Sequence, residues 1–307
     1  MVHARNSIAR GSKSFAMASK LFDPATRERA WLLYAWCRAC DDLADGQDMG
    51  HGMTIVRNPQ ERLTQIRERT TMALAGRQTG DPAFDGFGLV ARECGISPAL
   101  TNDLIEGFAL DAADWRPRTE GDLYRYCYHV AGVVGVMMAL VMGVPAEDDA
   151  TLDRAADLGL AFQLANVARD ICEDDTVGRC YLPVEWLVEM DMPPGEHMRP
   201  FYRKRLAVLA RRLATRAADY EASARVGAAA LPFRSAWAVL AAAGIYGDIA
   251  RTVAARGERA WDRRVVTTRA EKLGWVARAF GQAVASRRAG TVKPRPSDLW
   301  KRPGNSL

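Results

Sequence analysis

Apolar residues recur with the period of an α-helix through almost the whole sequence, and no stretch alternates in the manner of a β-strand. These segments are rich in Ala, Leu and Arg, all of which favour helix. Stretches such as WRPRTEGD and DMPPGEH interrupt the pattern with helix breakers. The expected helices cover residues 28–43, 59–75, 82–94, 99–109, 123–144, 150–174, 200–227, 233–256 and 269–287. The sequence therefore predicts an all-α protein.

The expected helices follow one another without a long polar linker. A chain of 307 residues suggests two domains at about 150 residues each, but no segment separates two halves. We therefore predict one all-α domain over residues 1–289. Residues 290–307 form a basic, proline-rich tail that we predict to be mobile.

Several function classes have no support in the sequence. It lacks the glycine motifs that bind nucleotide phosphates at the start of a helix. Cys37 and Cys40 form a C-x-x-C, but both lie in an apolar helical run and no second pair exists, so we expect buried thiols. None of the four histidines completes the Glu-x-x-His pair of a di-iron bundle.

Two features bear on membranes. The N-terminal stretch lacks the apolar core of a secretory signal. The apolar run 130–144 is shorter than the roughly 20 residues of a spanning helix. We expect it to be a buried helix whose glycines allow another helix or a ligand to approach closely.

Two of the expected helices carry a narrow polar stripe on an otherwise apolar surface. In the first, Tyr34, Arg38, Asp41 and Asp45 fall within roughly 60° of the helix circumference. In the second, the stripe spans roughly 80° and contains Gln163, Asn166, Asp170 and Asp174. A single stripe of this kind is typical of a solvated helix face. Two matching stripes on apolar helices instead favour the lining of a shared cavity.

Carboxylates one helical turn apart can share hard cations such as Mg²⁺. Cations held between two stripes could bind a diphosphate and withdraw charge from its leaving oxygen, with Arg38 and Arg169 adding contacts. Loss of diphosphate leaves a carbocation, which an apolar and aromatic pocket can stabilise while excluding water.

Three sequence blocks resemble the squalene and phytoene synthase family. They are YAWCRACDDLAD at residues 34–45, YCYHVAGVVG at 126–135 and QLANVARDICEDD at 163–175. The segment SKSF at residues 12–15 resembles the part of the family that covers the substrate. The resemblance extends from about residue 12 to residue 273.

The resemblance implies an isoprenoid-synthase-type helical bundle around a central active-site cavity. It also implies head-to-head condensation of two geranylgeranyl diphosphates, through prephytoene diphosphate, to 15-cis-phytoene, with release of two diphosphates in carotenoid biosynthesis. An Mg²⁺ or Mn²⁺ cluster is implied as cofactor, and no nicotinamide is expected.

The resemblance also assigns roles to individual residues of this sequence. The implied metal ligands are Asp41, Asp45, Asn166, Asp170 and Asp174. Tyr34 and Arg38 join the aspartates as catalytic residues. The implied substrate contacts are Ser12, Phe15, Tyr126, Val130, Ala131, Gly135, Gln163, Asn166, Arg169, Arg179, Tyr181, Tyr246 and Arg263. Spacing from Tyr246 favours Arg263 over Arg264, and Asp42 and Asp175 extend the acidic clusters.

Alternatives remain open. One is a relative that makes squalene or dehydrosqualene from farnesyl diphosphate, and another is an all-α metal-dependent diphosphohydrolase. A helical binding module would have no reason to bury matching acidic stripes.

The net charge of +5 suits diphosphates or anionic lipid, and nucleic acid is not expected as a partner. We expect a cytoplasmic protein in peripheral contact with the inner face of the membrane. A solvated helix face is the simplest interpretation of the arginines at 203, 205, 211, 212 and 216, but with Trp300 they could rest on lipid.

Overall fold

Every regular element in the described part of the chain is a helix. The computed structural model describes residues 1–45, 58–193, 195–287 and 293–304. The α-helices are α1 Val2–Gly11, α2 Lys13–Ser19, α3 Pro24–Asp45, α4 Pro59–Leu74, α5 Pro82–Cys94, α6 Pro98–Ala112, α7 Glu120–Cys127, α8 Val133–Val141, α9 Asp149–Thr176, α10 Val184–Glu189, α11 Arg203–Gly227, α12 Phe233–Arg256 and α13 Arg269–Ser286. Short turns follow 3₁₀ geometry at Pro200–Tyr202, Ala228–Ala230 and Gly257–Arg259, and π geometry at Tyr128–Gly132. The predicted all-α class is confirmed.

Local sequence signals account for most helix starts. Pro59, Pro82 and Pro98 occupy the first turns of α4, α5 and α6, where a missing N–H costs nothing. Thr119 and Thr268 form capping boxes that begin α7 and α13. The sequence prediction missed α1, α2 and α10, which are too short to display a clear period.

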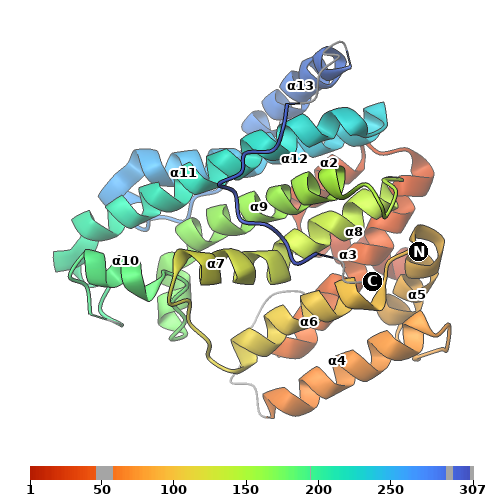
Figure 1. Ribbon diagram of the computed structural model, residues 1–307, viewed down its shortest axis with the longest axis horizontal. Helices are drawn as coiled ribbons and strands as arrows, with labels where there is room; N and C mark the ends of the chain where they lie inside the picture. The colour runs from red at the N-terminus through yellow and green to blue at the C-terminus, as the bar shows by residue number, and fades with distance from the viewer. Residues whose placement is uncertain (46–57, 194, 288–292, 305–307) are drawn as a thin grey trace.

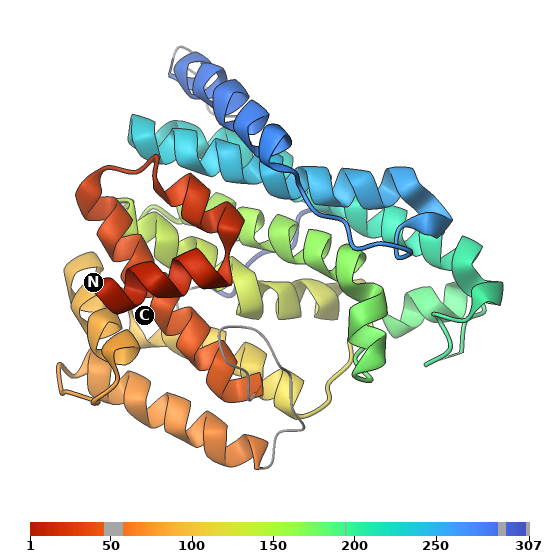
Figure 2. The ribbon, with the colours of Figure 1, turned by 180° about the vertical axis from the view of Figure 1, so that it is seen from behind.

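Helix α9 occupies the middle of the molecule, as Figure 1 shows, and packs against α8, α11 and α12. The view from behind in Figure 2 shows α1 lying across α3, while α2 packs mainly against α12. Buried residues from both halves of the chain, such as Trp36, Leu123, Leu164 and Leu209, belong to one continuous core. The helices therefore build one body around α9.

The π turn and α8 approach α9 with their backbones almost in contact. A Cβ atom at Gly135 would lie 2.2 Å from the carbonyl oxygen of Ala155, and one at Gly159 would lie 2.3 Å from that of Ala131. Only glycine permits such an approach. The glycines of the apolar run 130–144 thus admit a neighbouring helix, as expected.

Two helical stretches, Glu120–Val141 and Phe233–Arg259, have the length and composition of a membrane span. Of their apolar windows, 72% and 56% are buried inside the protein. Such burial is also typical of the core helices of a bundle.

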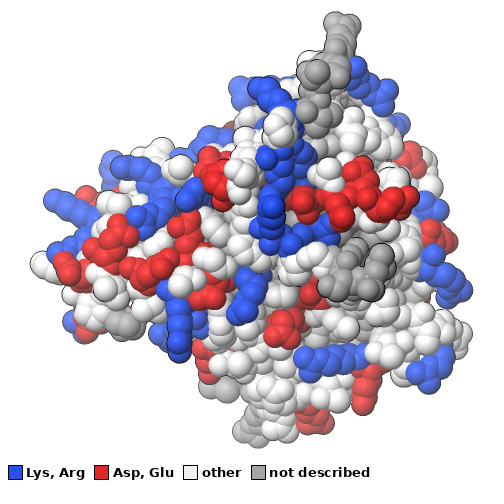
Figure 3. Space-filling view, viewed as in Figure 1, with Lys and Arg blue, Asp and Glu red and all other residues white. Residues whose placement is uncertain are grey.

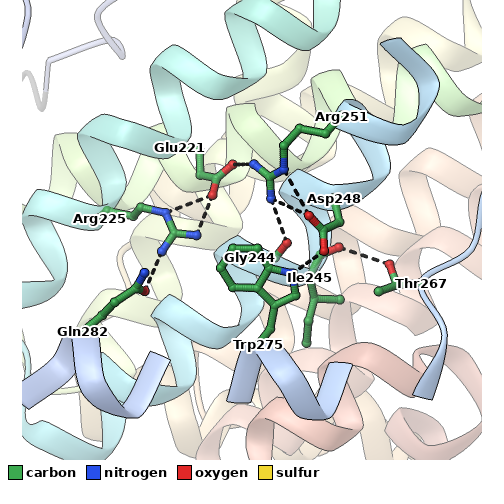
Figure 4. Close-up of polar contacts among 9 residues, drawn as sticks. All are labelled: Glu221, Arg225, Gly244, Ile245, Asp248, Arg251, Thr267, Trp275 and Gln282. Carbon is green, nitrogen blue, oxygen red and sulfur yellow. Dashed lines mark hydrogen bonds and ion pairs between the residues drawn. The ribbon is translucent and has the colours of Figure 1, made fainter. Parts of the chain in front are cut away.

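Helix α13 packs on the outside of α12 through a polar network, shown in Figure 4. Glu221 on α11 accepts hydrogen bonds from Arg225 at 2.6 Å and from Arg251 at 3.0 Å. The Trp275 indole donates to Asp248, and its ring fills the space where a side chain at Gly244 would stand. The network links α11, α12 and α13.

The C-terminal segment, residues 293–304, differs from the prediction of a mobile tail. Arg295 binds both carboxylate oxygens of Asp157 on α9, at 2.9 and 2.7 Å. Arg302 contacts Asp149 and Asp153 on the same helix. In Figure 3, basic side chains lie along the middle of this face, where the segment runs in Figure 1, and acidic side chains gather beside them. Composition suggested mobility, but the basic side chains pair with acidic side chains on α9, of which Asp157 is buried.

Candidate active site

A cavity of about 700 Å³ follows α9 through the bundle. Its walls come from segments far apart in sequence, including α2, α3, α8, α9 and α12. Most of the polar lining residues lie at one end, whereas small and apolar residues predominate in the remainder, with Thr151 and Arg154 as exceptions. A long apolar molecule with a charged head would match this distribution.

The two polar stripes meet in this cavity. Tyr34, Arg38 and Asp41 line it from α3. Gln163, Asn166, Asp170 and Asp174 line it from α9. Asp45 is the last residue of α3, and its side chain lies outside the described part of the structure. Apart from Asp45, the structure thus brings the predicted stripes together.

Arginines neutralise part of the acidic charge at this end. Arg38 contacts Asp41 at 2.5 Å and Asp42 at 3.8 Å. Arg169 donates two hydrogen bonds to Asp170, at 2.7 and 2.5 Å. The same guanidinium groups could bind an anionic ligand in place of these carboxylates.

A third arginine, Arg264, pairs with acidic side chains of α9 at this end. Its guanidinium lies 2.8 Å from Asp170 and 3.6 Å from Glu173. The exposed Arg263 contributes its backbone carbonyl to Arg256 and does not line the cavity in the described residues. Residues 260–268 do not continue the helical period of α12, so spacing from Tyr246 does not decide between the two arginines, and Arg263 as a diphosphate contact stays a prediction.

Asp174 is half-buried, and its charge is incompletely compensated. Burial raises the pKa of Asp174 to about 7, with a further contribution from the charge of Asp170, while Arg179 acts in the opposite direction. The buried Oδ1 atom of Asn166 has no hydrogen-bond partner among the described residues. A carboxylate that resists ionisation and an unsatisfied amide oxygen together fit a hard divalent cation.

Asp111 on α6 is a cavity residue that the sequence prediction missed. It accepts hydrogen bonds from the hydroxyl of Tyr126, at 3.0 Å, and from that of Tyr181, at 2.8 Å. The two tyrosine rings stack with centroids 4.7 Å apart. Burial, followed by the charge of Asp111, raises the pKa of both hydroxyls, so they remain donors. The available signal was a shared helix face with Leu104 and Phe108, which also line the cavity.

Helix α2 covers the polar end. Ser12 caps α2 by accepting a hydrogen bond from the Phe15 backbone at 3.2 Å. The Phe15 ring stacks on Tyr34 with centroids 5.7 Å apart, and all three residues line the cavity. Burial raises the pKa of the Tyr34 hydroxyl.

The remaining predicted contacts also line the cavity. Tyr246 lines it and stacks on Phe162, a lining residue that was not predicted, with ring centroids 4.1 Å apart. The other predicted lining residues are Val130, Ala131, Gly135, Gln163, Arg169 and Arg179.

Residues 8–271 match the family model described as squalene/phytoene synthase. The chain belongs to the squalene/phytoene synthase family. It is 48% identical over 303 residues to a 15-cis-phytoene synthase from Pantoea ananas, covering 98% of this chain and 97% of that protein. It is 45% identical to a 15-cis-phytoene synthase from a Paracoccus species, covering 96% and 95%.

Solved structures of the family share the helical bundle. A dehydrosqualene synthase crystallised with a ligand superposes with a TM-score of 0.81 at 25% identity, covering 92% of this chain and 96% of that one. A squalene synthase from Alicyclobacillus acidocaldarius gives a TM-score of 0.73 at 22% identity, covering 83% and 92%. The expected isoprenoid-synthase-type fold is therefore confirmed.

Proposed function

We propose that this member of the squalene/phytoene synthase family is a 15-cis-phytoene synthase, a prenyltransferase of carotenoid biosynthesis. Its substrates would be two geranylgeranyl diphosphates, joined through prephytoene diphosphate. The observation that carries the proposal is the cavity itself, with paired aspartates at one end and a long apolar remainder. The near-full-length relatives named 15-cis-phytoene synthase support it.

At the polar end, Arg38, Arg169 and Arg179 would bind the diphosphate oxygens. Asp41, Asp45, Asn166, Asp170 and Asp174 would hold Mg²⁺ or Mn²⁺. When bound, these ions supply Lewis-acid stabilisation of the departing diphosphate.

Beyond the polar end, the chain's own residues would control the carbocation. Aromatic faces at Phe162 and Tyr246 can stabilise positive charge. Tyr126 and Tyr181 are held by Asp111 with their stacked rings beside the cavity. Apolar walls keep water out, so the allylic cation would meet the second prenyl chain rather than hydrolyse.

Purified protein incubated with the C15 or the C20 diphosphate, with and without Mg²⁺ or Mn²⁺, tests this function. We expect a C40 hydrocarbon from the C20 substrate and no product after chelation. A C30 hydrocarbon from the C15 substrate would support a squalene or dehydrosqualene synthase instead. Prenyl alcohol as the only product would indicate a diphosphohydrolase.

We also propose a cytoplasmic location with peripheral contact at the inner face of the membrane, since the product is a hydrocarbon. An apolar and basic surface at one end of the molecule supports it, with Val188 67% and Phe201 79% exposed. Arg205 lies over the Phe201 ring and donates to the Met190 carbonyl. These contacts join α11 to the turn at Pro200–Tyr202 and to the end of α10. Of the arginines expected to face lipid, four pair with nearby acidic side chains, namely Arg203, Arg205, Arg212 and Arg216.

Co-sedimentation with vesicles tests the contact. We expect binding to vesicles that contain anionic lipid, weakened by salt and by Phe201→Ser. The exposed Leu89 on α5 lies outside this surface, and Leu89→Ser provides the matched control. Equal recovery with neutral and anionic vesicles, or none with either, would contradict the proposal.

A further inference from the structure

A charged residue lines the cavity near the end farthest from the aspartates. Arg154 lies on α9 about 24 Å along the helix axis from Asp170. The lining of this end combines small residues, Ala155, Ala224, Gly227 and Ala228, with Thr151, Met142 and Leu231. Among the described lining residues, Arg154 is the one charged group away from the aspartate end.

The side chain of Arg154 is fixed in place. Its residue is only 6% exposed. The guanidinium donates to the Ser223 carbonyl at 3.0 Å, to the Ser223 hydroxyl at 3.2 Å, and to the backbone carbonyl of Lys293. The aliphatic stem packs on Gly227, where an added Cβ would lie 2.7 Å from the Cβ of Arg154.

The partners of Arg154 are themselves anchored. Ser223 donates to Asp157 at 2.6 Å, and Asp157 also receives both hydrogen bonds from Arg295. Arg295 donates to the Trp300 carbonyl at 2.7 Å, and the Trp300 backbone donates to the Tyr220 hydroxyl. Three separate segments, α9, α11 and the C-terminal segment, thus converge on Arg154.

We propose that Arg154, held by Ser223 and the C-terminal segment, is the end wall that sets the longest prenyl chain the cavity accepts. This inference rests on the proposed prenyl synthase function. The diphosphate is fixed at the aspartate end, so a longer chain would have to displace a guanidinium from its hydrogen bonds. Such a displacement leaves buried polar groups unpaired, which makes the wall rigid.

Competition between C15, C20 and C25 diphosphates tests the wall. In Arg154→Ala, the ratio of kcat/KM for C25 over C20 should rise by at least about tenfold, the size typical of relieving a steric limit in an apolar pocket. Asp157 keeps its contacts with Arg295 and Ser223 in this variant, so the network that anchors the segment survives.

Two further variants make the result decisive. Ala228→Met adds bulk at the same end, and it should shift preference from C20 towards C15. Arg29→Ala removes a partly exposed arginine that pairs with Glu93 away from the cavity lining, and it should leave the ratios within about twofold of the wild-type values. If Arg154→Ala does not fold, Ala228→Met alone decides.

The outcomes separate this proposal from the proposed function. A wild-type preference for C15 would contradict the proposed phytoene synthase, while the wall would still be judged by the shift that each variant causes. Unchanged chain-length ratios in folded Arg154→Ala would contradict the proposal that Arg154 forms the end wall. If Arg154→Ala does not fold, unchanged ratios in Ala228→Met would contradict it.

Discussion

Asp170 is surrounded by several charged side chains. It binds Arg169 and Arg264 at once, while α9 places it in the cavity with Asp174 one turn away. If it holds a cation in the proposed reaction, the arginines must share or release it when metal binds.

Asp170→Asn should reduce kcat by more than about 100-fold while leaving the helical content intact. Asparagine keeps the shape and an oxygen but lacks the charge that a divalent cation needs. Product formation and circular dichroism measure the two effects. Asp219→Asn, on the exposed face of α11, is the control and should retain activity. Full turnover by Asp170→Asn would exclude it from the metal site.

Asp174→Asn should stabilise the metal-free protein, most strongly above pH 7. The pKa of Asp174 is raised to about 7 from an ordinary value of 3.8, so between these two pH values the folded state holds a proton that the unfolded state has already lost. Stability therefore falls as pH rises from about 4 to 7 and stays low above that. Asp174→Asn has no carboxyl group to ionise and so avoids this loss of stability. Its free energy of unfolding should exceed that of wild type by about 1–3 kcal/mol at pH 8.

Urea denaturation at pH 5 and pH 8, with a chelator present, measures this difference. The gain should be smaller at pH 5, where Asp174 is already largely protonated. A gain of equal size at both values would mean that the variant acts through packing rather than through charge.

The packing of α12 against its neighbouring helices affects the cavity, because α12 carries the lining residue Tyr246. The network around Glu221 holds α12 between α11 and α13. Glu221 is 6% exposed, and its two arginine partners lie on α11 and α12. The network therefore holds in place a helix that lines the cavity, although Glu221 and its two arginine partners do not line it themselves.

Glu221→Ala should lower the free energy of unfolding by about 2–4 kcal/mol, because it leaves two guanidinium groups without their buried partner. Glu189→Ala removes a similar pair with Arg212, at 2.8 Å, on the exposed surface. That control should cost less than about 1 kcal/mol. Equal losses for the two variants would show that burial adds nothing to the Glu221 network.

The helical period predicted the all-α class, and the two stripes predicted a shared cavity and the residues at its polar end, whereas the bundle and the other lining residues came from the resemblance to the family. Periodicity works for α3 and α9 because each is long and mostly apolar. It fails for α1, α2 and α10, which have too few turns.

Other features depend on contacts that no local pattern records. Asp111 joins the cavity only because α6 packs beside the π turn and α7. Arg264, rather than Arg263, reaches Asp170 because of the irregular chain after α12. The tail composition of 290–307 resembles a disordered segment, yet its arginines match aspartates more than a hundred residues earlier.

For the whole molecule, that match has a consequence for biosynthesis. The ribosome releases α1 to α13 before residues 293–304, and domains begin to fold during synthesis. Until then Asp149, Asp153 and Asp157 lack their arginine partners, and the Arg154 guanidinium lacks the Lys293 carbonyl. The nascent protein can thus assemble its aspartate-lined end before residues 293–304 complete the contacts at the opposite end.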